Sequence, residues 1–148
     1  MNSKERLLQA KRKSEEISAV FLKEYQELME EYELTSKQLN LLQFIQRNKQ
    51  TTMNDIARFL NASASAASQA IRKLEGEGYL MREVNVSNRR ETFVSLGEKG
   101  RTLLSDTEKA DVRIIEKYYM QLPEKEIEAY CCFVEQMHRL VNGVEESE

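Results

Sequence analysis

Hydrogen-bonding side chains of the kind that read another molecule are concentrated between positions 63 and 73. Ser65, Ser68 and Gln69 lie close together, and Arg72 and Lys73 follow about one helical turn later. A glutamine amide can pair in two places with the edge of an adenine, and short side chains permit close approach. Arginine and lysine neutralise phosphates, which adds affinity without sequence information. This composition favours recognition of a polyanion.

A second basic cluster follows at positions 88–90, where Asn88, Arg89 and Arg90 occupy the expected tip of a β-hairpin. Arginines on such a tip can enter a narrow minor groove, where the negative potential is concentrated. The predicted DNA-binding residues are therefore Ser63, Ser65, Ala66, Ser68, Gln69, Arg72, Lys73, Asn88, Arg89 and Arg90.

The charge distribution agrees with this interpretation, although the whole chain of 148 residues carries a net charge of −3. Residues 36–101 contain eleven basic and six acidic residues, which makes this segment +5. The two flanks together are −8. Positive charge is thus concentrated in the segment that could lie against a nucleic acid.

Other function classes find little support in the sequence. No nucleophile–base pair or pair of carboxylates indicates catalysis, so we do not expect an enzyme or a cofactor. One histidine, His138, and two adjacent cysteines, Cys131 and Cys132, do not make a zinc site. The cysteines are expected to be small buried residues. The longest apolar run, 129–134, is too short for a membrane helix, and no signal sequence is recognisable, so a cytoplasmic location is expected.

The hydrophobic pattern predicts the elements that position these residues. Amphipathic helices are expected over 4–32, from about 36, over 53–60, over 64–75, from 98 to about 120, and after Pro123. Thr35, Thr52 and Ser63 are the expected N-caps, and Asn61 is suited to the turn between the two short helices. Period-two alternation over 80–84 and 92–96 predicts a hairpin.

Two short helices followed by a hairpin are the plan of a winged helix-turn-helix. The expected fold class is mainly α with a small β-hairpin wing (α+β), with flanking dimerisation helices. In this plan the 64–75 helix enters the major groove, and the 88–90 tip lies beside it. The alternative for this helix is an ordinary amphipathic core helix, and for the tip arginines it is solvated surface charge.

At these residues the sequence resembles the MarR family of regulators. The matching positions are Leu34-Thr35 with Gln38, Asp55-Ile56-Ala57, Ser63 to Leu74, Glu75 with Gly78, Arg82, Asn88-Arg89-Arg90, Val94, Leu96 and Gly100. The chain departs from the family where Asn88 replaces a usual aspartate, Gly97 a usual serine or threonine, and Gln69 a frequent arginine. The Gln69 difference implies another base preference.

The resemblance implies a transcriptional regulator, most simply a repressor, that binds double-stranded operator DNA as a homodimer. It assigns residues 1–33 to an N-terminal dimerisation helix, 34–100 to the DNA-binding domain and 101–148 to C-terminal dimerisation helices. The operator would be pseudo-palindromic, with half-sites about one helical turn apart. Many family members release DNA when a small aromatic or anionic effector binds, which extends the expectation to such a ligand.

Two alternatives remain open at this stage. A winged-helix module that binds proteins without DNA would fit the acidic flanks and the pI near 5.5. A thiol-based redox sensor would rest on Cys131 and Cys132 alone. Five tyrosines are expected in the core or the dimer interface, with an effector pocket as the alternative role: Tyr25, Tyr32, Tyr118, Tyr119 and Tyr130.

Overall fold

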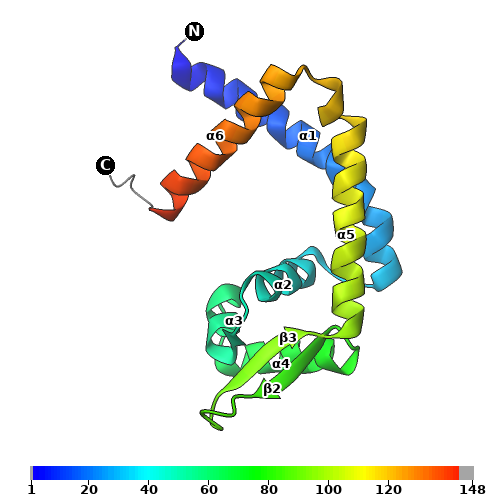
Figure 1. Cartoon of the computed structure of the whole chain (residues 1–148), viewed down its shortest axis with the longest axis vertical. Coiled ribbons are helices and arrows are strands. Elements are labelled where there is room, and N and C mark those ends of the chain that lie inside the picture. The colour runs from blue at the N-terminus through cyan, green and yellow to red at the C-terminus, as the bar shows by residue number, and fades with distance from the viewer. Residues whose placement is uncertain (1, 144–148) are drawn as a thin grey trace. The chain divides into compact units, whose positions relative to one another are not determined.

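The computed structural model describes residues 2–143 and divides into two compact units. The first unit extends to Ala110, and the second begins at Asp111. In chain order the elements are α1 (Ser3–Tyr32), α2 (Ser36–Arg47), β1 (Thr51–Thr52), α3 (Met53–Leu60), α4 (Ala64–Gly76), β2 (Leu80–Val84), β3 (Thr92–Leu96), α5 (Glu98–Lys117), the 3-10 turn η1 (Tyr119–Gln121) and α6 (Glu124–Asn142) (Figure 1). The predicted fold class is confirmed.

Reciprocal hydrogen bonds begin two of the short helices at the positions that the sequence indicates. The Gln38 amide N–H donates to Thr35 Oγ1 at 3.2 Å, and the Thr35 N–H donates to Gln38 Oε1 at 2.8 Å. Thr52 and Asp55 repeat this arrangement at the start of α3. Each pair satisfies amide groups that a helix N-terminus otherwise leaves without partners.

The turn between α3 and α4 also follows the prediction. Asn61 adopts the left-handed conformation, with φ of 48°, and ends α3. Ser63 then caps α4, because its Oγ accepts a hydrogen bond from the Ala66 amide at 3.1 Å. Asparagine tolerates a left-handed backbone better than most residues, so the chain can reverse here without glycine.

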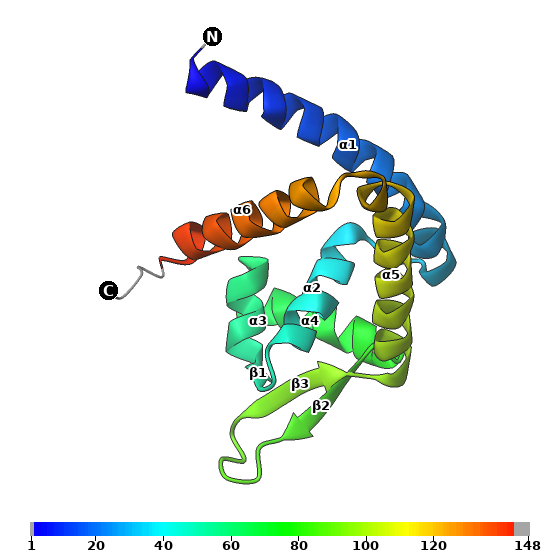
Figure 2. The ribbon, with the colours of Figure 1, turned by 45° about the horizontal axis from the view of Figure 1, so that its top comes forward.

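A three-stranded antiparallel sheet, in the order β1-β3-β2, adjoins these helices (Figure 2). Leu80 is opposite Leu96 and Val84 is opposite Thr92 in the predicted hairpin. The two-residue strand β1 was not predicted, since two threonines before a helix carry no period-two pattern. Its pairing of Thr51 with Val94 depends on backbone groups.

The first unit has one continuous hydrophobic core. The core joins α2, α3, α4, the hairpin and the start of α5, and its buried residues are Leu34, Leu41, Leu42, Ile45, Ile56, Ala67, Ile71, Leu74, Tyr79, Leu80, Val94, Leu96, Leu103 and Leu104. Side chains from α1, including Leu28 and Met29, pack against it while remaining partly exposed. The elements that carry the candidate site therefore share one support.

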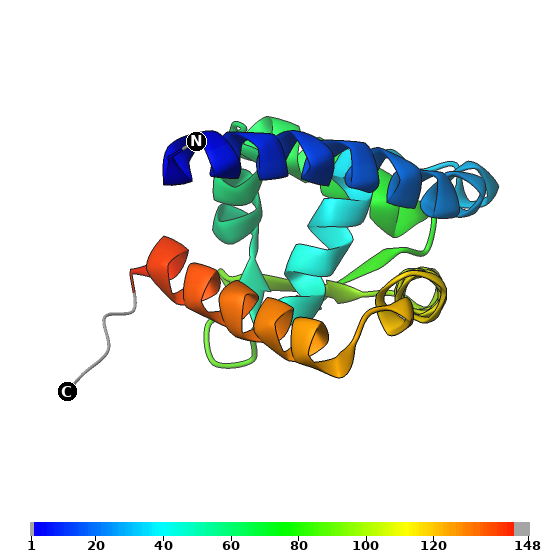
Figure 3. The same ribbon diagram turned by 90° about the horizontal axis from the view of Figure 1, so that it is seen from above.

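The second unit contains the end of α5, η1 and α6. Helix α6 is one continuous helix, and so is α1 in the first unit (Figure 3). The helix predicted to reach about residue 120 ends at Lys117 instead. Leu122 precedes Pro123 and has an extended backbone, with φ of −84° and ψ of 149°. A proline disfavours helical backbone at the residue before it, so the chain leaves the helix through a short 3-10 turn. No helix among residues 2–143 could span a membrane.

Candidate nucleic-acid interface

One face of α4 combines exposure with hydrogen-bonding side chains. Ser65, Ala66, Gln69, Arg72 and Lys73 are exposed. Two other predicted residues are placed differently: the half-buried Ser68 lies at the margin of this face, and the exposed Ser63 serves as the N-cap. The structure thus brings the predicted α4 residues together on one short helix.

Burial of the opposite face of α4 fixes which side chains face outward. Ala67, Ile71 and Leu74 are at most 1% exposed and follow helical spacing. Since residues three and four apart share a face, these three direct Ser65 and Gln69 away from the core. We call the exposed set Ser65, Ala66, Gln69 and Arg72 the α4 face.

The wing tip, residues 85–91, is closed by its own hydrogen bonds. The Asn85 amide N–H donates to the Glu91 carbonyl oxygen at 3.0 Å, and the Asn85 side chain donates to Glu91 Oε2 at 3.0 Å. The Glu91 N–H donates to the Asn88 carbonyl oxygen at 2.9 Å. Two successive turns therefore define the tip, which extends beyond the helices of the first unit in Figure 2.

Asn88 has a backbone role at this tip. Its Oδ1 accepts a hydrogen bond from the Arg90 amide at 3.3 Å. An amide oxygen can accept this bond as a carboxylate would, so the asparagine preserves the turn without a negative charge. Asn88, Arg89 and Arg90 are all exposed. The two guanidinium groups are consequently available to an external anion.

An ion pair connects the wing to the C-terminal turn of α4. Arg82 Nε of β2 lies 3.0 Å from Glu75 Oε2, and both side chains are about one-third exposed. Both residues belong to the positions that carry the family resemblance, but the sequence did not predict their contact. The ion pair ties α4, which carries the α4 face, to β2, which leads to the wing tip. It therefore limits how far the wing can move independently of α4.

The backbone after α4 passes close to the start of α5. Tyr79 is 1% exposed, and its carbonyl oxygen accepts a hydrogen bond from the Gly97 amide at 2.8 Å. A Cβ on Gly100 would lie 2.2 Å from the same carbonyl oxygen, and a Cβ on Gly97 would lie 2.3 Å from the Gly78 carbonyl oxygen. Glycine at position 97 is therefore required by the close approach of two backbone segments.

The cysteines do not follow the prediction. Cys131 and Cys132 are free and exposed in the described chain, not buried. They lie on α6, a helix with no buried residue of its own, so no core is available to cover them. His138 is exposed on the same helix. Within residues 2–143 no three histidine, cysteine, aspartate or glutamate side chains form a group that could hold a metal ion.

Comparison with known proteins assigns the central segment. Residues 34–100 match the family model described as a winged helix DNA-binding domain. The chain is 27% identical over 94 residues to YwhA, an uncharacterized HTH-type transcriptional regulator of Bacillus subtilis, and the match covers 64% of this chain and 68% of that protein. It is also 27% identical over 96 residues to the HTH-type transcriptional regulator Hpr of Bacillus mycoides, covering 65% of this chain and 48% of Hpr.

Solved structures show the same fold over most of the chain. The complex of Staphylococcus aureus MepR with DNA aligns with a TM-score of 0.67 and 22% identity, covering 86% of this chain and 96% of that chain. MepR bound to ethidium bromide aligns with a TM-score of 0.69 and 21% identity, covering 88% and 95%. This similarity shows the fold that the sequence resemblance implies, and the two curated relatives are HTH-type transcriptional regulators. The chain is a DNA-binding transcriptional regulator of the winged-helix type, with its winged helix DNA-binding domain at residues 34–100.

Proposed function

We propose that this regulator is a sequence-specific repressor that binds a pseudo-palindromic operator as a homodimer. One observation carries the proposal: the α4 face and the wing-tip arginines are exposed on a single unit with a common core. A helix in the major groove and a basic hairpin beside it use these two surfaces together. MepR, a protein of the same fold, has been solved in complex with DNA, which supports DNA as the ligand.

The two surfaces divide the recognition between them. Gln69 is the principal base reader, and Ser65 and Ala66 allow α4 to approach the base edges. Arg72 and Lys73 contact phosphates and position the helix. Arg89 and Arg90 enter the adjacent minor groove, with Asn88 holding the turn between them and the strand.

Uncovered apolar side chains support the homodimer. Leu7, Ile17 and Leu22 are 51–64% exposed on α1, and Phe133 and Leu140 are 54% and 75% exposed on α6. Isolated apolar residues are common on surfaces, but stripes along two whole helices are typical of an interaction surface. Residues 1–33 and 101–148 are the proposed dimerisation segments, of which positions 1 and 144–148 lie outside the described residues.

The proposal includes release of the operator by a small aromatic or anionic effector. MepR, which shares the fold, has been solved with ethidium bromide, an aromatic compound. An effector with different affinities for the DNA-competent and DNA-incompetent states would shift the population between them. Adding candidate aromatic compounds to the operator complex would test this part independently of DNA binding.

The test is a binding titration on the chain's own promoter fragment at several salt concentrations. Log affinity should fall linearly with log salt, and Arg90→Ala should lower affinity and reduce the slope by about one. Arg113→Ala removes an exposed arginine outside residues 34–100 and is the matched control. In vitro transcription from the same promoter should then decrease when the protein is added. Salt-independent binding, or equal effects of the two variants, would contradict the proposal.

A further inference from the structure

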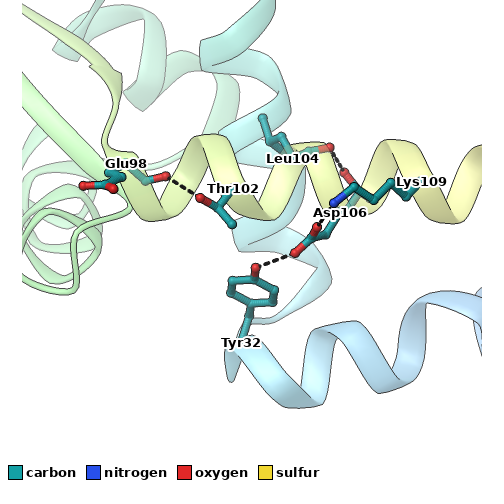
Figure 4. Close-up of polar contacts among 7 residues, drawn as sticks. Tyr32, Glu98, Thr102, Leu104, Asp106 and Lys109 are labelled. Atoms are coloured by element: carbon teal, nitrogen blue, oxygen red, sulfur yellow. Dashed lines mark hydrogen bonds and ion pairs between the residues drawn. The ribbon is translucent and has the colours of Figure 1, made fainter.

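Three elements of the first unit meet at a pair of tyrosines. Tyr32 is the last residue of α1, and its hydroxyl donates to Asp106 Oδ2 of α5 at 2.7 Å (Figure 4). The Tyr79 hydroxyl donates to the Tyr32 backbone carbonyl oxygen at 2.8 Å. The two rings lie 6.4 Å apart between centroids. The end of α1, the middle of α5 and the segment after α4 are thus joined by two side-chain hydrogen bonds, which we call the tyrosine joint.

Tyr79 transmits the position of this joint directly to α4. It lies three residues beyond Gly76, where α4 ends, and its amide N–H donates to the Leu74 carbonyl oxygen of α4 at 2.9 Å. The ring is buried, and the Lys99 ammonium group lies 4.6 Å from its centroid. A buried ring bonded at both its hydroxyl and its backbone has little freedom to move. Tyr79 must therefore either resist a displacement of α1 relative to α5 or transmit that displacement to the end of α4.

The charge at Asp106 strengthens the bond to Tyr32. Lys109 Nζ lies 2.9 Å from Asp106 Oδ1, and this contact, followed by the Tyr32 hydroxyl, lowers the pKa of Asp106. The same hydrogen bond raises the pKa of Tyr32 to about 12. The acceptor is ionised and the donor is protonated at neutral pH, and bonds of this charge-assisted type are stronger than neutral ones.

We propose that the Tyr32–Asp106 hydrogen bond sets the angle at which α1 and α5 hold α4, and so determines which half-site spacing the operator must have. Tyr32 and Asp106 are then positioning residues, remote from the α4 face. The inference rests on the proposed function, because spacing matters only for a dimer that reads two half-sites. Geometry makes the effect large enough to measure: a tilt of about 10° over about 20 Å shifts a group by about 3.5 Å, close to the rise of one base pair.

The experiment compares operators whose half-site spacing is shortened or lengthened by one base pair. Tyr32→Phe keeps the ring beside Tyr79 and removes only the hydroxyl donor. Wild type should prefer one spacing, and Tyr32→Phe should reduce the affinity ratio between the best and the altered spacings at least threefold. Thr102→Ala removes a hydroxyl that donates to Glu98 O within α5, and this control should leave the ratio unchanged. A general loss of stability would instead lower affinity for all spacings equally.

A double-mutant cycle assigns the effect to this bond. Asp106→Ala should reduce the affinity ratio between the best and the altered spacings as Tyr32→Phe does. The double variant should reduce this ratio no further, because both substitutions remove the same hydrogen bond. Asp106→Asn retains an Oδ1 acceptor and should restore part of the ratio. A wild-type ratio in folded Tyr32→Phe, or additive effects in the double variant, would overturn the proposal. Failure of wild type to bind any spacing would refute the proposed function itself, which is a distinguishable result.

Discussion

The DNA-binding segment and the flanking helices bury their apolar residues in different ways. Between Leu34 and Leu104 the chain forms a closed core from short helices and a hairpin. By contrast, α1 and α6 contain no buried residue, although both carry apolar stripes. The central segment is therefore stabilised within one chain, whereas the flanking helices need a second surface to cover them. In the proposed homodimer, the reading surface would stay rigid while assembly depends on protein concentration.

The same substitution in the two regions should give the largest contrast. Ile71→Ala in α4 removes a side chain that is 0% exposed and should cost about 2–5 kcal/mol of unfolding free energy at any protein concentration. Ile115→Ala in α5 removes one that is 46% exposed, and its smaller cost should fall further as the dimer dissociates at low protein concentration. Denaturant unfolding at several protein concentrations measures both. Equal, concentration-independent costs would abolish the contrast.

Two glycines offer a second comparison within the central region. Gly100→Ala places a Cβ against the Tyr79 carbonyl oxygen and should cost about 1–3 kcal/mol by overpacking. Gly76→Ala meets nothing within 4 Å and should be neutral or stabilising by about 0.4–1 kcal/mol. Thermal unfolding should show a lower Tm for Gly100→Ala and an unchanged or higher Tm for Gly76→Ala. A stable Gly100→Ala protein would mean that the α4–β2 connection and α5 are not closely packed.

The uncovered region is tested by a charge on its apolar stripe. Phe133 is 54% exposed on α6, so Phe133→Asp should leave the folded chain intact while weakening the dimer at least tenfold, which is about 1.4 kcal/mol. Sedimentation velocity over a concentration series measures this change. Lys125→Asp, at an exposed polar position of the same helix, is the control. If neither variant alters association, α6 does not form the dimer interface.

The smallest expected effect concerns the start of α3. Thr52→Ala removes the cap oxygen that accepts from the Asp55 amide at 3.2 Å and should cost about 1 kcal/mol. Thermal unfolding at neutral pH measures this cost. Ser36→Ala changes an exposed hydroxyl at the first position of α2 and is the control. A cost for Thr52→Ala no greater than that of the control would show that the cap contributes nothing.

The Asp55 carboxylate makes this cap dependent on pH. The Thr52 backbone N–H, then its hydroxyl, lowers the pKa of Asp55 below the usual 3.8. A lowered folded pKa gives stability that is present above about pH 4 and lost as the pH falls through the folded value. The difference in stability between wild type and Asp55→Asn should therefore shrink below about pH 4 in acid unfolding curves. A constant difference would contradict the assigned cause.

Local signals in the sequence were sufficient for much of the fold. Thr35, Thr52, Asn61 and Ser63 act within three residues of themselves, and hairpin alternation depends on immediate neighbours, so both were predictable. The Tyr32–Asp106 bond joins residues 74 positions apart, and no pattern within one segment identifies it. Strand β1 was not predictable for the same reason, because it exists only through its pairing with the distant strand β3.

The candidate site shows the same limit. The residues of the α4 face follow from helical spacing, because the buried Ala67, Ile71 and Leu74 leave only one face outward. Their contacts with DNA remain predictions, since exposure identifies available groups without identifying a ligand. The prediction that the cysteines are buried was wrong, because helical spacing on α6 indicates an apolar stripe but does not indicate whether the same chain covers that stripe.

Hydroxyl-radical footprinting of the chain's own promoter tests most directly whether the α4 face and the wing read DNA. We expect two protected patches about one helical turn apart, flanked by minor-groove protection that disappears in the Arg89→Ala/Arg90→Ala variant. Gln69→Ala should keep the general position of the complex and relax the base preference beneath α4. Protection spread along the promoter without a defined position would contradict the account, and so would a footprint unchanged by all three substitutions.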